Sequence, residues 1–250
     1  MSFFDYSSVY NYPIFLEECK SEGANRLFGD TIDKYHSYVK HVTPPQRRIN
    51  YNIYETQSGN HIGSVGISSC VLAIGSRDNW IGWDKDTRLH NSNSVCNNYR
   101  FCLIQPNITI KNVGTMVLKT LREEAVKRWE SKYGDPLALM ETFVQPDIEN
   151  STNKRNGAVY LADNWHMVGM TQGNSISKAP VLLWQKEDSK RGELARLNPE
   201  EAIKKYAVGN NHYVITESPK KLVFVKPLRK DWKKILLAPA LVTQSVQSVE

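Results

Sequence analysis

The stretch that decides the fold covers residues 99–146 and reads YRFCLIQPNITIKNVGTMVLKTLREEAVKRWESKYGDPLALMETFVQP. It opens with a run of aromatic and β-branched residues that stops at Pro106, as a strand does. Over residues 111–133 apolar side chains recur every four residues and charged ones fill the other face, which predicts a long amphipathic helix. The apolar run over 136–146 then predicts a short buried strand. A strand, a long helix and a second strand in this order indicate a partly parallel sheet covered by helices.

The segments on both sides of this stretch extend the sheet. Two alternating runs, INYNIYET at 49–56 and HIGSVGISSCVLAI at 61–74, enclose the turn QSGN and predict a β-hairpin. Further along, NGAVYLADNW at 156–165 predicts a short helix and HMVGMTQG at 166–173 another strand. We expect the last pair of strands to be VLLWQK or HYVITE with KLVFVKPL.

This order predicts one α/β domain, in the broad α+β sense, with additions at both ends. The domain covers residues 46–237 and contains no internal repeat. Residues 1–45 are expected to be a partly helical N-terminal extension, which ends at HVTPPQRR, where two prolines favour an extended turn. Residues 238–250 are expected to be a C-terminal tail.

The composition excludes several classes of protein. The 250 residues are 40% apolar and 23% charged, which excludes wholesale disorder, collagen-like chains and disulfide scaffolds. No apolar run is long enough to span a membrane, and the N-terminus lacks the basic region of a signal peptide. The cysteines form no CxxC pair and the histidines no HxxxH pair, so we expect reduced thiols in a cytoplasmic protein and no metal site. The absence of G-x-S-x-G and P-loop motifs argues against a hydrolase or an NTPase.

The net charge of +6 is concentrated near the C-terminus. Residues 186–250 contain 13 Lys/Arg and 8 Asp/Glu, whereas residues 1–185 contain 19 and 18. A one-sided basic surface is typical of proteins that bind polyanions such as nucleic acids. The alternative is a solvated surface with ordinary lysines.

The start of the long helix is a candidate phosphate site. It follows directly after a strand, and the first N–H groups of a helix have no partner and carry the positive end of the helix dipole. Gly114 allows the backbone to approach a ligand closely, and Lys111 adds a positive charge. The alternative is an ordinary helix start.

The order of elements, with a short helix carrying A-x-x-Y before the last strand of this region, resembles the GNAT acetyltransferase superfamily. In that superfamily a Q/R-x-x-G-x-G/A loop holds the pyrophosphate of acetyl-CoA. The matching residues here run from a lysine in place of Arg/Gln to a methionine in place of the second small residue: Lys111, Asn112, Val113, Gly114, Thr115 and Met116. The resemblance implies a GNAT-like mixed sheet flanked by helices, with a splayed central strand pair and acetyl-CoA or another acyl donor as cofactor.

Tyr160 lies in the short helix, at the position of the tyrosine that protonates the leaving thiolate in GNAT enzymes. The resemblance therefore implies a catalytic role for Tyr160, and the alternative is a core aromatic with a hydrogen-bonded hydroxyl. Asn164 follows one turn later and is expected to share that face and contact the cofactor, or else to cap the helix.

Five strings, in order along the chain, resemble the DruA family of the Druantia anti-phage defence system over about residues 45–236. They are RDNWIGW (77–83), NNYRFCLI (97–104), LALMETFV (137–144), YLADNWHMVGMTQG (160–173) and KLVFVKPLRKDWKKIL (221–236). DruA is itself similar to the phage Mom proteins, which modify adenine in DNA on a GNAT-type fold. The resemblance implies a protein of phage–host conflict that acts in a bacterial or phage-infected cell.

The string RDNWIGW places a carboxylate among aromatic rings. Asp78 is a candidate acid–base group, because burial or an adjacent cation shifts the pKa of a carboxyl. Arg77, Trp80 and Trp83 are candidate nucleic-acid contacts, since tryptophan stacks on bases. The alternatives are a buried Arg77–Asp78 pair that fixes a loop, and tryptophans in the core.

A second carboxylate, Glu141, lies in the apolar run LMETFV. Burying it without a partner is costly, so we expect it to face the active cleft as a base or as a hydrogen-bond acceptor for an amine. Arg100 is expected either to contact phosphate or to pair with Glu141 across adjacent strands.

These observations support two main hypotheses. The first is a GNAT-fold transferase that modifies a base amine in DNA, in the manner of Mom. The second is a non-catalytic or nuclease-like DNA-binding component of an anti-phage system. A third is a GNAT enzyme acting on a protein or a small amine.

Overall fold

The computed structural model describes six stretches of the chain. They are residues 13–36, 40–44, 46–108, 110–146, 156–178 and 213–239. The chain divides into two compact units, which we describe separately. The larger contains residues 1–144, 157–169 and 223–250, and the smaller contains residues 145–156 and 170–222.

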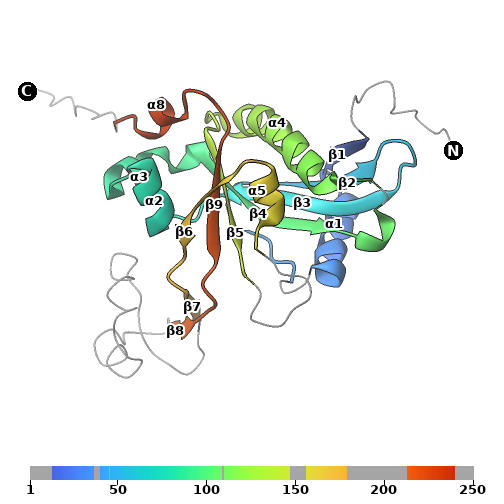
Figure 1. The fold of residues 1–250 in the computed structure, drawn as a ribbon, viewed down its shortest axis with the longest axis horizontal. Coiled ribbons are helices and arrows are strands. Elements are labelled where there is room, and N and C mark those ends of the chain that lie inside the picture. Colours follow the sequence, from blue (N-terminus) through green and yellow to red (C-terminus); the bar gives the residue numbers. More distant parts are fainter. Residues whose placement is uncertain are drawn as a thin grey trace, which may run out of the picture. The chain divides into compact units, whose positions relative to one another are not determined.

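The larger unit is built on a seven-stranded mixed sheet with the order β1-β2-β3-β4-β5-β9-β6 (Figure 1). Its strands are β1 (Ile14–Glu18), β2 (Arg48–Glu55), β3 (His61–Ser69), β4 (Val95–Leu103), β5 (Leu139–Val144), β6 (His166–Met170) and β9 (Leu222–Pro227). Neighbouring strands from β1 to β4 pair antiparallel, whereas β4 and β5 pair in parallel. The predicted α/β fold with a partly parallel sheet is therefore confirmed.

Helices cover both faces of this sheet (Figure 1). They are α1 (Glu22–Tyr35), α2 (Gly75–Ile81), α3 (Lys85–Asn91), α4 (Val113–Tyr133), α5 (Ala158–Ala162) and α8 (Trp232–Leu236), with single 3₁₀ turns at Ser92–Ser94 and Gln105–Asn107. The predicted long helix is α4, and it begins at Val113 because Asn112 adopts a left-handed conformation with φ of 57°. Among the residues described, no helix is both long and apolar enough to cross a membrane.

The parallel pairing of β4 and β5 is short. It joins three residue pairs and ends with Asn97 opposite Glu141, although both strands continue. Just beyond this point the register of β4 with β3 shifts, so that Asn98 lies opposite Ile67 and Arg100 opposite Gly66, which leaves Tyr99 as a bulge. A bulge bends its strand and increases the local twist. The two central strands therefore part after Asn97 and Glu141.

The described part of residues 1–45 contains a strand as well as the expected helix. The strand β1 pairs with β2 over five residues and forms the edge of the main sheet. The helix α1 follows, with Ser21 as a cap whose hydroxyl accepts a hydrogen bond from the N–H of Ala24 at 3.1 Å. Five residues are too few to show a clear alternation, which is why the sequence indicated only a helical extension.

The smaller unit shows one difference from the expected strand pairing. HYVITE does form a strand, β8 (Tyr213–Glu217), but it pairs antiparallel with β7 (Asn174–Lys178) in a separate two-stranded sheet. Its expected partner KLVFVKPL forms β9, which lies between β5 and β6. The alternative partner VLLWQK lies outside the described residues.

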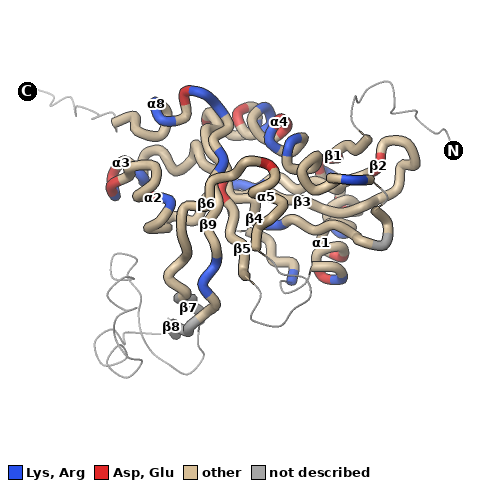
Figure 2. Tube along the Cα trace, in the orientation of Figure 1, with Lys and Arg blue, Asp and Glu red and all other residues tan. Residues whose placement is uncertain are grey.

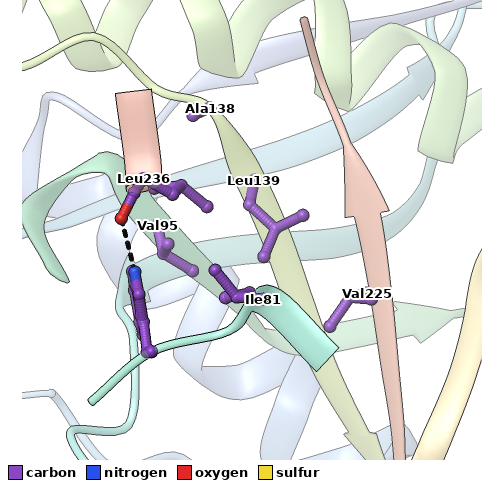
Figure 3. Close-up of a cluster of buried hydrophobic side chains, with 7 residues drawn as sticks. Ile81, Val95, Ala138, Leu139, Val225 and Leu236 are labelled. Atoms are coloured by element: carbon purple, nitrogen blue, oxygen red, sulfur yellow. Dashed lines mark hydrogen bonds between the residues drawn. The ribbon is translucent and has the colours of Figure 1, made fainter. Parts of the chain in front are cut away.

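A hydrophobic core fixes the sheet against the short helices α2 and α8 (Figure 3). Its buried members are Ile81, Trp83, Val95, Ala138, Leu139, Val225 and Leu236. The indole N–H of Trp83 donates to the carbonyl of Leu236 at 2.6 Å, so the ring is both packed and hydrogen-bonded. This core supports the N-terminal half of β4 and the strand β5, which carries Glu141.

Candidate functional site

The hydroxyl of Tyr160 lies where β4 and β5 part. It donates a hydrogen bond to Oδ1 of Asn98 on β4 at 3.0 Å and lies 3.5 Å from Oγ1 of Thr142 on β5. Thr142 in turn donates to the carbonyl of Asn98 at 3.0 Å. These three side chains, which we call the hydroxyl network, join α5 to both central strands.

The ring of Tyr160 is held by three aromatic neighbours. It stacks on Phe224 at 5.7 Å between ring centroids and meets Trp165 edge-on at 5.0 Å, with Phe101 at 6.2 Å. Only 6% of Tyr160 is exposed. Tyr160 is therefore a core aromatic with a hydrogen-bonded hydroxyl, and that hydroxyl also lies at the parting of the strands.

The start of α4 lies against α5. A Cβ on Gly114 would be 2.6 Å from Cγ2 of Val159 and 3.9 Å from Cζ of Phe101, so only glycine fits this contact without displacing Val159. An ion pair between Arg122 of α4 and Asp163, just after α5, holds the two helices together. The turn around Gly114 and Tyr160 are thus neighbours, joined through Val159 and Phe101.

The outer side of the same turn has the chemistry that a phosphate group needs. Lys111 and Asn112 are exposed, and the side chain of Asn112 makes no capping hydrogen bond. Within the described residues nothing accepts a hydrogen bond from the N–H groups of Val113, Gly114 and Thr115. The hydroxyl of Thr115 donates to the carbonyl of Asn112 at 2.9 Å, which keeps the turn compact. This outer side leaves the first N–H groups of α4 open to an anion such as a phosphate group, whereas the side facing α5 is filled by Val159.

Glu141 and Asp78 belong to a different site, which we call the Arg77 network. The guanidinium of Arg77 donates to Oε2 of Glu141 at 2.6 Å and to Oδ1 of Asp78 at 2.7 Å, and none of its side chain is exposed. Arg88 pairs with Oδ2 of Asp78 at 2.9 Å, and the N–H of Val71 donates to Oε1 of Glu141 at 2.8 Å. All four carboxylate oxygens therefore have a partner.

Burial raises the pKa of Glu141, and the guanidinium of Arg77 and the N–H of Val71 act against this shift. Glu141 and Thr142 are adjacent in β5, and adjacent strand residues point to opposite faces of a sheet. Glu141 therefore lies on the face opposite the hydroxyl network. The structure brings Asp78, Arg77 and Glu141 together, but not with Tyr160, and it shows the buried Arg77–Asp78 pair of the alternative interpretation.

The two candidate tryptophans have different surroundings. Trp83 is buried in the core, with the Arg77 guanidinium 5.3 Å from its ring. Trp80 is partly exposed and stacks on Trp232 with 4.8 Å between centroids and 7° between planes, and His166 lies on the same cluster at 5.5 Å. Only Trp80 is thus placed to take part in a stacking surface.

Asn164 and Arg100 both form hydrogen bonds that involve backbone carbonyl groups. Asn164 is exposed with φ of 57°, directly after the cap of α5, and its carbonyl accepts a hydrogen bond from Lys226 at 3.1 Å. Arg100 donates to the carbonyls of Tyr99 at 2.7 Å and Lys40 at 3.1 Å. Of the two alternatives for Arg100, the pair with Glu141 is not among these contacts, since the strands pair only as far as Glu141 and Arg77 binds that carboxylate.

Sequence reasoning missed Asn98, Thr142 and Val159. The signal was present for the first two, since each is a polar residue inside a run that reads as a buried strand and needs a hydrogen-bond partner. Nothing local marks Val159 as the residue that fills the space beside Gly114. Across the described residues no group of three His, Cys, Asp or Glu side chains is arranged to hold a metal ion.

Comparisons with known proteins place the chain in a family. A family model described as Druantia protein DruA matches residues 11–181, so it includes β1 and α1. Two solved structures are similar at low identity. A candidate acetyltransferase from Sphaerobacter thermophilus DSM 20745 is 9% identical, with 86% of this chain and 93% of that chain covered and a TM-score of 0.39. A tandem GNAT protein from the clavulanic acid biosynthesis pathway is 7% identical, with 86% and 98% covered and a TM-score of 0.43.

A search of curated proteins gives no match. The family model, by contrast, spans well over half of the sequence. The chain therefore belongs to the family of the Druantia protein DruA.

Proposed function

We propose that this chain is a GNAT-type acyltransferase of phage defence that transfers an acyl group to the exocyclic amine of a base in DNA. One observation carries the proposal: the hydroxyl of Tyr160 lies between the parting strands β4 and β5, next to the turn that begins α4. This is where a thioester would lie if its pyrophosphate were bound by the first N–H groups of α4. Modification of adenine in the manner of Mom is the specific form of the proposal that the sequence resemblance implied.

The chain's own residues would divide the work as follows. Lys111 and the N–H groups of residues 113–115 would hold the pyrophosphate of acyl-CoA, which supplies the activated acyl group. Rotation about the Cζ–Oη bond of Tyr160 turns its proton from Asn98 toward the leaving sulfur, while the hydroxyl of Thr142 turns from the carbonyl of Asn98 to the phenol oxygen 3.5 Å away. The bond from the amine nitrogen to the acyl carbon forms as the carbon–sulfur bond breaks, and the proton of the amine passes through water to restore the phenol of Tyr160.

Two features support DNA as the acceptor. The described part of the C-terminal quarter is basic, with lysines and arginines along β9 and the segment leading into α8 (Figure 2). The partly exposed Trp80 stacks on Trp232 of α8. This pair of rings offers an aromatic surface beside positive charge. A base buried in a duplex must be turned out of the stack before its amine can react, so such a surface is useful.

The test is mass spectrometry of nucleosides from the DNA of cells that express the protein. Wild-type protein should produce a modified nucleoside, and Tyr160→Phe should reduce its amount by about 10²–10⁴-fold, the usual contribution of a general acid. Tyr51→Phe is the matched control, because Tyr51 is also buried and its hydroxyl has no hydrogen-bond partner among the described residues. An unmodified profile with soluble wild-type protein, or equal modification by both variants, contradicts the proposal.

A second candidate function is a non-catalytic DNA-binding component of the same defence system. It is favoured by Val159, which fills the inner side of the Gly114 turn, and by the hydrogen bond that already engages Tyr160. This alternative expects salt-dependent binding of DNA and no binding of acyl-CoA.

A further inference from the structure

A polar cleft lies where β1 leaves β2, and none of the residues that the sequence analysis selected lines it. The β1–β2 register ends with Glu18 opposite Tyr51, and the N–H of Cys19 then donates to the carbonyl of Asn50 before the chain turns into α1. The cleft has a volume of about 470 Å³. Its lining residues come from β1, α1, β2 and the end of α4, and they include Glu18, Arg47, Arg48, Asn50, Lys132 and Tyr133.

The wall of the cleft is fixed by the end of α4. The hydroxyl of Tyr133 accepts a hydrogen bond from the N–H of Arg48 at 2.9 Å and donates to the carbonyl of Arg48 at 2.8 Å. Lys132 donates to the same carbonyl at 3.3 Å, and the guanidinium of Arg47 lies 5.0 Å from the ring of Tyr133. The backbone that carries the cationic side chains is therefore already fixed. This lowers the entropic cost of ordering these side chains around a ligand.

Positive charge predominates in the lining. Arg47, Arg48 and Lys132 are cations, whereas Glu18 is the one carboxylate among the lining residues. Glu18 is already opposed by Lys20 at 3.7 Å and by Lys132 at 3.9 Å. One of the three cations, Arg47, also pairs with Asp135, which does not line the cleft. An anion in the cleft would thus meet a net positive lining.

Uncharged donors add to this charge. Asn50 is only 9% exposed, and its Oδ1 accepts a hydrogen bond from the hydroxyl of Tyr99 at 2.7 Å. Its NH₂ group has no partner among the described residues, and neither has the side chain of Gln46. The bond from Tyr99 fixes the orientation of the Asn50 amide, so its NH₂ group is already oriented before a ligand oxygen binds.

We propose that this cleft binds a phosphate ester of nucleotide size, either a free nucleotide or a phosphate at the end of a nucleic-acid strand. Guanidinium groups bind phosphate oxygens through paired hydrogen bonds, and Arg48 makes no ion pair among the described residues. Lys132 and Arg47 add positive charge that Glu18 and Asp135 partly offset. The volume is within the range of small-molecule sites, and it exceeds what a lone inorganic ion needs. The proposal is independent of acyl transfer, because it concerns other residues.

The test is calorimetric titration of the full chain with two probes, deoxyadenosine monophosphate and a 5′-phosphorylated single-stranded oligonucleotide. Arg48→Gln and Lys132→Gln should each weaken binding by about tenfold, since each removes a charged donor. Lys127→Gln is the matched control, because it removes one charge from the exposed face of the same helix outside the cleft. Equal thermal midpoints for the three variants would show that all are folded.

The outcomes separate the sources of the phosphate. Binding of the mononucleotide that depends on Arg48 indicates a free nucleotide, and binding of the oligonucleotide alone indicates the end of a strand. The proposal is overturned if neither probe binds saturably, or if Lys127→Gln weakens binding as much as Arg48→Gln does. It is also overturned if Lys111→Glu abolishes binding while Arg48→Gln does not, because the nucleotide then binds at the start of α4.

Discussion

The hydroxyl network and the Arg77 network lie on opposite faces of β5, one residue apart in the sequence. On one face Thr142 meets Tyr160 and Asn98, and every group is neutral. On the other face Glu141 meets Arg77 in a fully buried ion pair. Charged groups removed from water must be completely paired, so the second network is committed to holding the fold. A neutral hydroxyl can exchange one acceptor for another at little cost, so the first is better suited to chemistry.

The largest expected effect comes from breaking the Arg77 network. Arg77→Met leaves the buried carboxylates of Glu141 and Asp78 without their shared partner, and should cost about 3–5 kcal/mol of unfolding free energy. Urea denaturation measures this. The double variant Arg77→Met/Glu141→Gln should recover part of the loss, and a loss of under about 1 kcal/mol in the single variant would show that the pair is dispensable.

A smaller effect is expected from the contact that joins α4 to α5. In Gly114→Ala the new methyl group would meet Val159 at 2.6 Å, which should cost about 1–3 kcal/mol by overpacking. A double-mutant cycle with Val159→Ala checks the cause, because the two substitutions should compensate each other. Additive losses would mean that Gly114 is needed for another reason.

Tyr160→Phe should lower the free energy of unfolding by less than either of these changes. It removes one hydrogen bond between neutral groups and keeps the ring packing, so the expected cost is about 0.5–1.5 kcal/mol. Thermal unfolding of Tyr160→Phe beside Tyr51→Phe isolates that bond. A loss as large as that of Arg77→Met would mean that the hydroxyl network is structural as well, which would remove the contrast between the two faces.

The smallest loss of stability is expected at Arg88, the partly exposed side chain at the edge of the Arg77 network. Arg88→Gln removes the pair with Oδ2 of Asp78, but Asp78 keeps its bonds to Arg77, and the Arg88 side chain is partly exposed. The expected cost is about 1 kcal/mol or less, measured by the shift of the urea midpoint. A cost near that of Arg77→Met would place the key charge of the network at Arg88 instead.

The elements with strong local patterns could be predicted from the sequence. The hairpin β2–β3, the helix α4 and the buried strand β5 each follow from hydrophobic periodicity and turn residues. The pairing of β8 with β7 could not, because the choice between distant strands depends on contacts that no local pattern encodes. The strand β1 was missed because five residues are too few to alternate clearly.

The residues of the two networks show the same limit of prediction from local sequence patterns. Sequence reasoning found that Glu141 needs a partner, but it could not identify Arg77, which lies 64 residues earlier and reaches Glu141 only through the fold. It selected Tyr160 by resemblance. Asn98 and Thr142 could not be selected as its partners, because they contact Tyr160 only at the point where two strands part. The burial of a polar residue can be expected from the sequence, but the face on which it lies depends on register.

The account is tested most directly by calorimetric titration of the full chain with acetyl-CoA. It predicts that wild type binds, that Lys111→Glu abolishes binding by reversing the charge beside the α4 turn, and that Lys127→Gln and Tyr160→Phe bind as wild type does. Failure of the wild-type protein to bind, or equal binding by Lys111→Glu, would contradict the claim that the start of α4 and Tyr160 form one acyl-transfer site.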